Sequence, residues 1–118
     1  MSVEGLLNEY IELAKLHGMA LSEYDATKAN RLHSRIMKLH RDLLSLGPNA
    51  QSAFLELLEH SDMAVRCWAA SQSLDVAPER AEAVLREIAA EGPLPLKVNA
   101  RTVLMGWRSG SSGPPTRE

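Results

Sequence analysis

Apolar residues recur at intervals of three and four positions through six successive segments of this 118-residue chain. That spacing is the repeat of one face of an α-helix, and it limits the fold more than any other property of the sequence. The longest stripe lies in segment 25–46 and consists of Ala29, Leu32, Ile36, Leu39, Leu43 and Leu46. Val, Ile and Thr are sparse and never alternate with polar residues as they would in a half-buried strand. The sequence therefore predicts an all-α protein.

Aspartate, glycine and proline separate the helical segments. Asp25 and Asp62 are suited to cap the helices that follow them. Gly47 and Pro48 end segment 25–46, with the glycine in a left-handed conformation and the proline unable to continue the helix. A second break lies at residues 92–95, whose sequence is GPLP. The other helices are predicted over 2–21, 49–60, 62–76, 78–91 and 96–107, so that about six helices form three antiparallel pairs.

The helical pattern continues to Arg108. We interpret residues 1–108 as a single domain, whose length is sufficient to bury a core without a metal or disulfide. Residues 109–118 contain no apolar anchor, and we expect them to form a disordered C-terminal tail. The chain has one cysteine, no apolar run of the ~18 residues that a membrane span needs, and acidic residues where a signal peptide has basic ones. These features predict a cytoplasmic protein that does not bind membranes.

Two stretches of the chain are alike when the sequence is shifted by 30 residues. Residues 55–74 then align with residues 85–104, with leucine, isoleucine and alanine at matching positions. The breaks between helices also coincide, because Ser61 and Asp62 fall close to Gly92 and Pro93. A repeated helical pair with a matching break is typical of a short helical solenoid.

The stretch LLEHSDMAVRCWAA, residues 57–70, resembles a HEAT repeat unit. The resemblance implies that Asp62 and Arg66 have structural roles, tying neighbouring turns together. The chain from about Val3 to Trp107 is also similar to a bacterial family of small HEAT-like helical domains of unknown function, through residues 57–70 and 30–32. The second repeat departs from the pattern, since Leu96 stands where the first has Arg66. The resemblance implies a short HEAT-like solenoid and supplies no activity.

The reactive side chains predict no enzyme. Cys67 has no adjacent histidine and lies among apolar residues, so we expect a buried thiol. Glu79 and Glu82 share a helix face but lack the apolar neighbours that would raise a carboxyl pKa. The glycines are scattered singly and form no phosphate-binding loop. We therefore expect neither a catalytic nor a cofactor site.

The four histidines predict no metal site. His33 and His40 share a helix face but stand about 10 Å apart along the helix axis. That distance is too great for one ion, whose ligands lie near 2 Å from its centre. His17 and His60 are assigned to helix C-termini, where an imidazolium is stabilised by the helix dipole.

The charged residues are divided unequally between odd and even helices. The net charge of −2 excludes a globally basic nucleic-acid binder. The first, third and fifth helices carry ten acidic and three basic residues, a charge of −7, whereas the second, fourth and sixth carry nine basic and four acidic residues, a charge of +5. In a solenoid of helical pairs, odd and even helices line opposite surfaces. The split thus predicts an acidic outer face and a basic inner face.

The basic face is the candidate binding surface. We expect it to consist of Lys28, Arg31, Arg35, Lys38, Lys97 and Arg101. It would attract an acidic protein partner, and an immunity protein that neutralises a bacterial toxin would be one instance by analogy with other small HEAT-like proteins. Nucleic-acid or phosphate binding on the same face is the alternative, which lacks flanking aromatic residues. A solvated flank without a partner is the third interpretation.

Self-association is a further expectation. No polar capping helix follows the last helix in the sequence, and Leu96, Val103 and Trp107 lie on its apolar face. The end of a solenoid exposes such a face unless something covers it. We therefore expect a weak homo-oligomer that forms through the last helix.

Overall fold

The computed structural model describes residues 2–109. Within this range the chain forms six α-helices and one short 3-10 helix, and no strand. The elements are α1 (Val3–Ser22), α2 (Ala26–Leu44), α3 (Pro48–Leu55), η1 (Glu56–Glu59), α4 (Met63–Ser71), α5 (Pro78–Glu91) and α6 (Leu94–Ser109). The predicted all-α class is confirmed.

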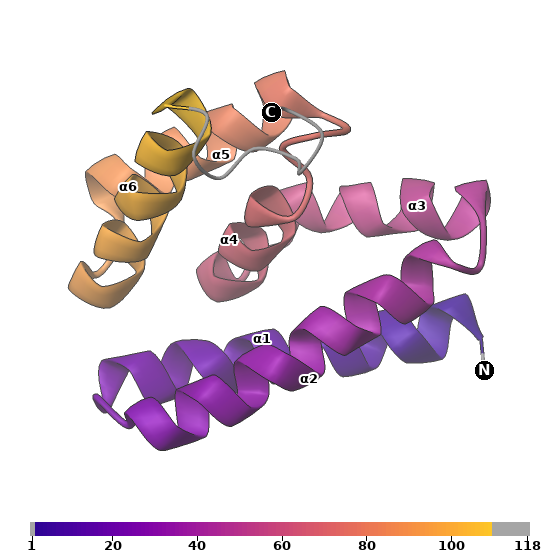
Figure 1. Cartoon of the computed structure of the whole chain (residues 1–118), viewed down its shortest axis with the longest axis horizontal. Coiled ribbons are helices and arrows are strands. Elements are labelled where there is room, and N and C mark those ends of the chain that lie inside the picture. The colour runs from indigo at the N-terminus through magenta and orange to yellow at the C-terminus, as the bar shows by residue number, and fades with distance from the viewer. Residues whose placement is uncertain (1, 110–118) are drawn as a thin grey trace.

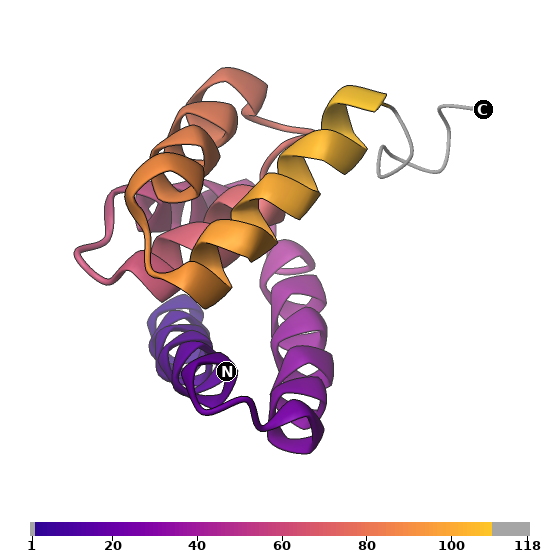
Figure 2. The same cartoon turned by 90° about the vertical axis from the view of Figure 1, so that its left-hand side faces the viewer.

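The helices are arranged around α4. Figure 1 shows α1 and α2 lying side by side along one edge of the molecule, with α5 and α6 at the opposite corner and α4 between the two pairs. Helix α4 packs on α1, α5, α6 and η1, while α3 connects α2 to η1. In the perpendicular view, α6 crosses above the α1–α2 pair (Figure 2). The central position of α4 is what brings its side chains between the two pairs.

The predicted caps explain where α2, α3 and α4 begin. The Asp25 side chain accepts a hydrogen bond from the backbone N–H of Lys28 at 3.1 Å. Gly47 has a φ of +107°, a conformation that favours glycine, and Pro48 is the first residue of α3. The Asp62 carboxylate accepts the N–H groups of two residues in the first turn of α4. These three boundaries could be predicted because one or two adjacent residues determine each of them.

Arg66 completes the turn that precedes α4. Its guanidinium Nη1 donates to the carbonyl oxygens of His60 and Ser61, at 2.8 and 3.3 Å. His60 Nδ1 in turn accepts the backbone N–H of Asp62 at 2.9 Å. The hydrogen bonds of Asp62 and Arg66 thus hold this turn together, and both residues are structural within it.

Three of the predicted helix ends differ from the structure. Helix α4 ends at Ser71 instead of near residue 76. The Ser71 hydroxyl donates a hydrogen bond to the Cys67 carbonyl. The next turn is tighter than an α-helix, because Ser73 N–H bonds to Ala70 O, only three residues earlier. The third predicted helix finishes as η1. Helix α6 begins at Leu94 and includes Ser109, the first residue of the predicted tail. The rest of that tail, 110–118, lies outside the described residues.

Tyr10 occupies the centre of the core. Its side chain is fully buried and meets the Phe54 ring edge-to-face, with ring centroids 5.1 Å apart. The Tyr10 hydroxyl donates a hydrogen bond to Gln72 Oε1, and burial raises the pKa of the Tyr10 phenol well above its usual value. Tyr10 therefore links α1 to α3 and to the turn after α4.

Gly18 allows α1 and α4 to approach closely. A Cβ atom on Gly18 would lie 2.8 Å from the Cβ of Ala64, less than ordinary carbon–carbon contact. Helix α1 continues through Gly18 to Ser22, so the prediction that His17 caps its C-terminus is wrong. The glycine is required by the contact with α4 and does not end the helix.

None of the helices within residues 2–109 is long and apolar enough to cross a membrane.

Candidate functional site

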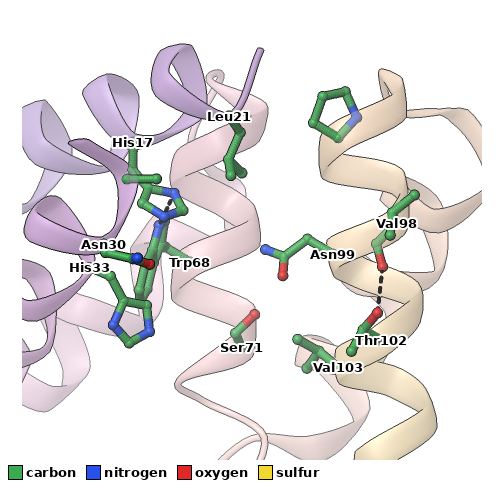
Figure 3. A pocket seen from close by; sticks show the side chains of 12 residues that line it. His17, Leu21, Asn30, His33, Trp68, Ser71, Val98, Asn99, Thr102 and Val103 are labelled. Carbon is green, nitrogen blue, oxygen red and sulfur yellow. Dashed lines mark hydrogen bonds between the residues drawn. The ribbon is translucent and has the colours of Figure 1, made fainter. Parts of the chain in front are cut away.

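A cavity of about 410 Å³ lies between the α1–α2 pair and α6, with α4 behind it (Figure 3). Helices α1 and α2 supply one wall, and α6 supplies the other. The residues that line it are His17, Leu21, Ala29, Asn30, His33, Trp68, Ser71, Pro95, Val98, Asn99, Thr102 and Val103. It is larger than three other hollows in the described residues, whose volumes are about 310, 100 and 190 Å³.

Trp68 and two histidines form an aromatic cluster on one side of the cavity. The Trp68 Nε1–H donates to His17 Nδ1 at 3.2 Å, and the two rings meet edge-to-face with centroids 5.2 Å apart. The His33 ring lies 5.3 Å from that of Trp68. Because His17 Nδ1 accepts this hydrogen bond, a neutral His17 carries its proton on Nε2. The cluster fixes both the tautomer of His17 and the orientation of Trp68.

His17 is held in its neutral form. Its side chain is buried, which lowers its pKa from the usual 6.5, and the nearby His33 lowers the pKa further. Burial likewise lowers the pKa of His40, which packs on Phe54, while Asp75 opposes that shift. Both histidines therefore favour the neutral state in the folded protein.

These pKa shifts predict that the protein loses stability in mild acid. Between pH 6.5 and the lowered pKa values the unfolded chain binds more protons than the folded chain, so the free energy of unfolding falls as the pH falls. We expect a lower midpoint of thermal unfolding at pH 5 than at pH 7.5. His17→Asn, whose Oδ1 can replace Nδ1 as acceptor, should reduce this difference. Equal pH dependence in the variant and the wild type would contradict the prediction for His17.

The walls of the cavity carry neutral polar groups. Asn30 of α2 and Asn99 of α6 lie on opposite sides, and the Asn99 carboxamide points into the space between the helices (Figure 3). The Ser71 and Thr102 hydroxyls donate to carbonyl oxygens of their own helices, so each retains only acceptor capacity toward the cavity. The lining contains no Asp, Glu, Lys or Arg. The site therefore offers hydrogen bonds and apolar contact without a fixed charge.

The buried thiol of Cys67 lies beneath the cavity and does not line it. Burial raises the pKa of Cys67 to about 11, although hydrogen bonds from Ser71 and Asn99 oppose the shift. The thiol is thus protonated at neutral pH and a poor nucleophile. Within residues 2–109, no three His, Cys, Asp or Glu side chains are grouped to hold a metal ion.

None of the four basic residues predicted on α2 lines the cavity, and two of them, Arg35 and Lys38, lie beside α1. Arg35 Nη2 stands 3.9 Å from Glu9 Oε2 of α1, and Lys38 Nζ stands 3.1 Å from Asp42 Oδ2 of its own helix. Arg35 and Lys38 also line a smaller depression between α1 and α2. Lys28 and Arg31 are exposed, and neither makes an ion pair within the described residues. We define Lys28, Arg31, Arg35 and Lys38 as the α2 basic ridge.

The two basic residues predicted on α6 are separate from this ridge. Lys97 is half-buried, Arg101 is exposed, and neither lines the cavity. The structure therefore places the four basic residues of α2 in one row. It does not bring them together with Lys97 and Arg101 around the cavity. Their role in binding a partner stays a prediction.

The exposed apolar residues of α6 agree only in part with those expected. Leu96 is buried, whereas Val103 and Trp107 pack against the core but remain partly exposed, as expected. The most exposed apolar residues of α6 are Leu94, Val98 and Met105. Self-association through this helix stays a prediction, with further residues available to it.

Sequence reasoning missed the cavity because its residues come from four helices. His17, Asn30, Trp68 and Asn99 have no mutual spacing that defines a motif. The one local signal is that Asn30 and Asn99 each adjoin an alanine of the buried stripe, which places a carboxamide at the edge of a packed helix face.

Comparison with known proteins identifies a family and a fold. A family model described as a domain of unknown function, DUF2019, matches residues 4–106. The crystal structure of the protein RPA1889 from Rhodopseudomonas palustris CGA009 superimposes with a TM-score of 0.85 at 25% sequence identity, covering 97% of this chain and 94% of that one. No curated protein matches the sequence. Because the family model spans most of the chain, this protein belongs to the DUF2019 family.

Proposed function

We propose that the protein is a non-enzymatic protein-interaction module that binds an acidic partner through the α2 basic ridge, with Lys97 and Arg101 as further contacts. The fold is a short HEAT-like solenoid built from antiparallel helix pairs, and the setting is the cytoplasm. Neutralisation of a bacterial toxin by an immunity protein is one instance of such binding. The observation that carries the proposal is a row of four cations on one helix, two of which, Lys28 and Arg31, have no carboxylate partner among residues 2–109.

The ridge is available because its existing ion pairs are weak. Arg35 and Glu9 are both about half exposed and stand 3.9 Å apart, and the Lys38–Asp42 pair joins residues on one surface turn. Exposed pairs of this kind contribute about 0–1 kcal/mol. A partner carboxylate can therefore replace Glu9 or Asp42 with little loss of free energy. Lys28 and Arg31 can bind a partner carboxylate without first breaking an ion pair within residues 2–109.

The ridge also stands on a rigid support. The apolar stripe of α2 is buried, and α2 packs along most of α1. Asp25 and Gly47 fix the two ends of the helix, so the four side chains keep their spacing along one face. A partner would meet a preformed row of charges, which lowers the ordering cost of binding.

Two charge variants of equal size test the proposal. Lys28→Gln/Arg31→Gln removes two ridge charges, and Arg80→Gln/Arg86→Gln removes two charges from α5, where both arginines are paired with carboxylates. Proteins retained by each tagged protein in cells of the native organism are quantified after capture at 50 and 300 mM salt. We expect one protein to be retained by the wild type and the α5 variant, and to fall at least about tenfold with the ridge variant and with high salt.

Several outcomes would overturn the proposal. Retention of no protein at 50 mM salt contradicts it, as does a partner that the ridge variant retains equally well. Ridge-dependent retention that nuclease treatment abolishes would assign the surface to nucleic acid, the alternative function. A third variant, Lys97→Gln/Arg101→Gln, determines whether the α6 cations contact the same partner.

A further inference from the structure

We propose that the cavity between α2 and α6 is a cleft for an extended peptide segment, in which one apolar side chain of the segment packs on Trp68 while Asn30 and Asn99 hydrogen-bond to its main chain. The inference rests on the proposed function, because the segment belongs to the protein partner, and it adds a second contact surface that carries no charge.

The size and lining of the cavity suit an apolar side chain. Its volume of about 410 Å³ lies within the range of roughly 300–1,000 Å³ typical of ligand sites. Leu21, Ala29, Val98 and Val103 line it together with the indole of Trp68. Burying an aliphatic or aromatic side chain there removes apolar surface from water on both partners.

The two carboxamides match the main chain of a peptide. Each carboxamide carries both N–H donors and a carbonyl acceptor, and so does each peptide unit. Asn30 and Asn99 lie on facing walls, so a chain that runs between α2 and α6 can meet one of them on each side (Figure 3). This arrangement recognises backbone groups independently of the sequence, while the apolar pocket supplies selectivity.

Both carboxamides are available for such bonds. The Asn30 side chain is exposed and makes no hydrogen bond within the part of the chain that the structure describes. The Asn99 amide makes a contact of 3.8 Å with the Cys67 sulfur, a weak acceptor. Exchanging that contact for a peptide carbonyl is therefore favourable.

The absence of charged residues from the lining defines the part of the partner that enters. A Lys, Arg, Asp or Glu side chain would lose part of its hydration there and meet none of these residue types in the lining. The inserted side chain is therefore neutral and apolar. Acidic residues of the segment remain outside, on the side of Arg101, which is exposed and lies three residues after the cavity residue Val98.

Peptide selection on the full chain tests the inference. Random dodecapeptides displayed on phage are enriched on the immobilised wild-type protein, and the enriched sequences are synthesised for affinity measurement by fluorescence anisotropy. We expect them to share an apolar residue and to bind Asn30→Ala/Asn99→Ala at least about tenfold more weakly than the wild type. Binding should also shift the Trp68 indole N–H resonance in a ¹H–¹⁵N spectrum.

A matched variant separates the cleft from a general effect of losing two carboxamides. Asn8→Ala/Asn49→Ala changes two exposed asparagines on α1 and α3 that lie outside the cavity, and it should bind the peptides as the wild type does. Failure to enrich any sequence, or equal affinity for all three proteins, overturns the cleft. If the cleft binds no peptide but capture of the protein partner still requires Lys28 and Arg31, only the cleft is refuted and the proposed function stands. If the cleft binds peptides but capture of the partner does not require Lys28 and Arg31, the role of the α2 basic ridge is refuted instead.

Discussion

Replacement of Tyr10 by alanine is expected to lower the free energy of unfolding by about 3 to 5 kcal/mol, the usual cost of deleting a large aromatic side chain from a core. The Tyr10 ring is fully buried, and removing it leaves a cavity beside Phe54 that the packed helices around it cannot fill by collapse. Since small domains are stable by only about 5 to 15 kcal/mol, the loss is a large fraction of the total. Urea unfolding followed by circular dichroism at 222 nm measures it.

Tyr10→Phe separates the packing of this residue from its hydrogen bond. The phenylalanine keeps the edge-to-face contact with Phe54 but leaves Gln72 Oε1 without the Tyr10 hydroxyl. We expect a loss of only about 1 to 2 kcal/mol, the cost of one broken, partly buried hydrogen bond. A Tyr10→Ala variant as stable as Tyr10→Phe would contradict the central position of the ring in the core.

The structure joins α1 to the α4 region through two polar contacts. The Tyr10 hydroxyl reaches Gln72 just beyond the end of α4, and His17 receives the Trp68 N–H two turns further along α1. Both contacts are directional, so they determine the rotation of α4 relative to α1 as well as the distance between them. The position of Trp68 in the cavity therefore depends on the core and not on the cavity walls alone.

Sequence patterns predicted the features that a few neighbouring residues decide. The all-α class followed from the apolar spacing, and the ends of α2 followed from Asp25 and from Gly47 with Pro48. The buried state of Cys67 followed from its apolar neighbours. Each of these features is determined by residues that are close together in the sequence, so the sequence alone is sufficient to predict it.

Features that depend on contacts between helices far apart in the sequence could not be predicted from the sequence. The helix predicted over 2–21 already included Gly18, but no neighbouring residue indicates that Ala64, 46 residues later, packs closely against this glycine. The cavity brings together residues as far apart as His17 and Asn99. The apolar pattern of a helix indicates which of its faces is buried, but not which face of which other helix packs against it.

The division of charge between odd and even helices illustrates the same limit. The counts of −7 and +5 are properties of whole helices, whereas the structure places Glu9 of α1, an odd helix, beside Arg35 of α2, an even one. Charges of opposite sign therefore meet between an odd and an even helix, and Arg80 of α5 beside Glu59 of η1 shows that they also meet between two odd helices. Within residues 2–109, Lys28 and Arg31 are the two members of the α2 basic ridge without an ion pair, so the division of charge by whole helices does not describe which charges are free.

Gly18→Val is expected to lower the free energy of unfolding by about 3 kcal/mol, at the upper end of the usual cost of overpacking. The first added carbon would already stand 2.8 Å from the Ala64 Cβ, and two further methyl groups must be accommodated between α1 and α4. The better helix propensity of valine compensates for only part of this, since glycine costs a helix interior about 1 kcal/mol relative to alanine. Urea unfolding again gives the measurement. Gly5→Val is the matched control on the same helix, where an added Cβ meets only the Ser2 hydroxyl, and it should change stability by less than about 1 kcal/mol.

A double-mutant cycle then tests whether Ala64 is the cause. Ala64→Gly removes the atom that the new side chain meets, at the price of a glycine within α4. If the close approach of the two helices is responsible, Gly18→Val combined with Ala64→Gly is less destabilising than the sum of the single changes, with a coupling of about 1 to 2 kcal/mol. Because α4 carries Trp68, the separation forced by valine should also disturb the Trp68 to His17 hydrogen bond and shift the indole N–H resonance. Additive effects, with an unshifted indole resonance in Gly18→Val, would mean that α1 and α4 do not meet at Gly18 as closely as the structure shows.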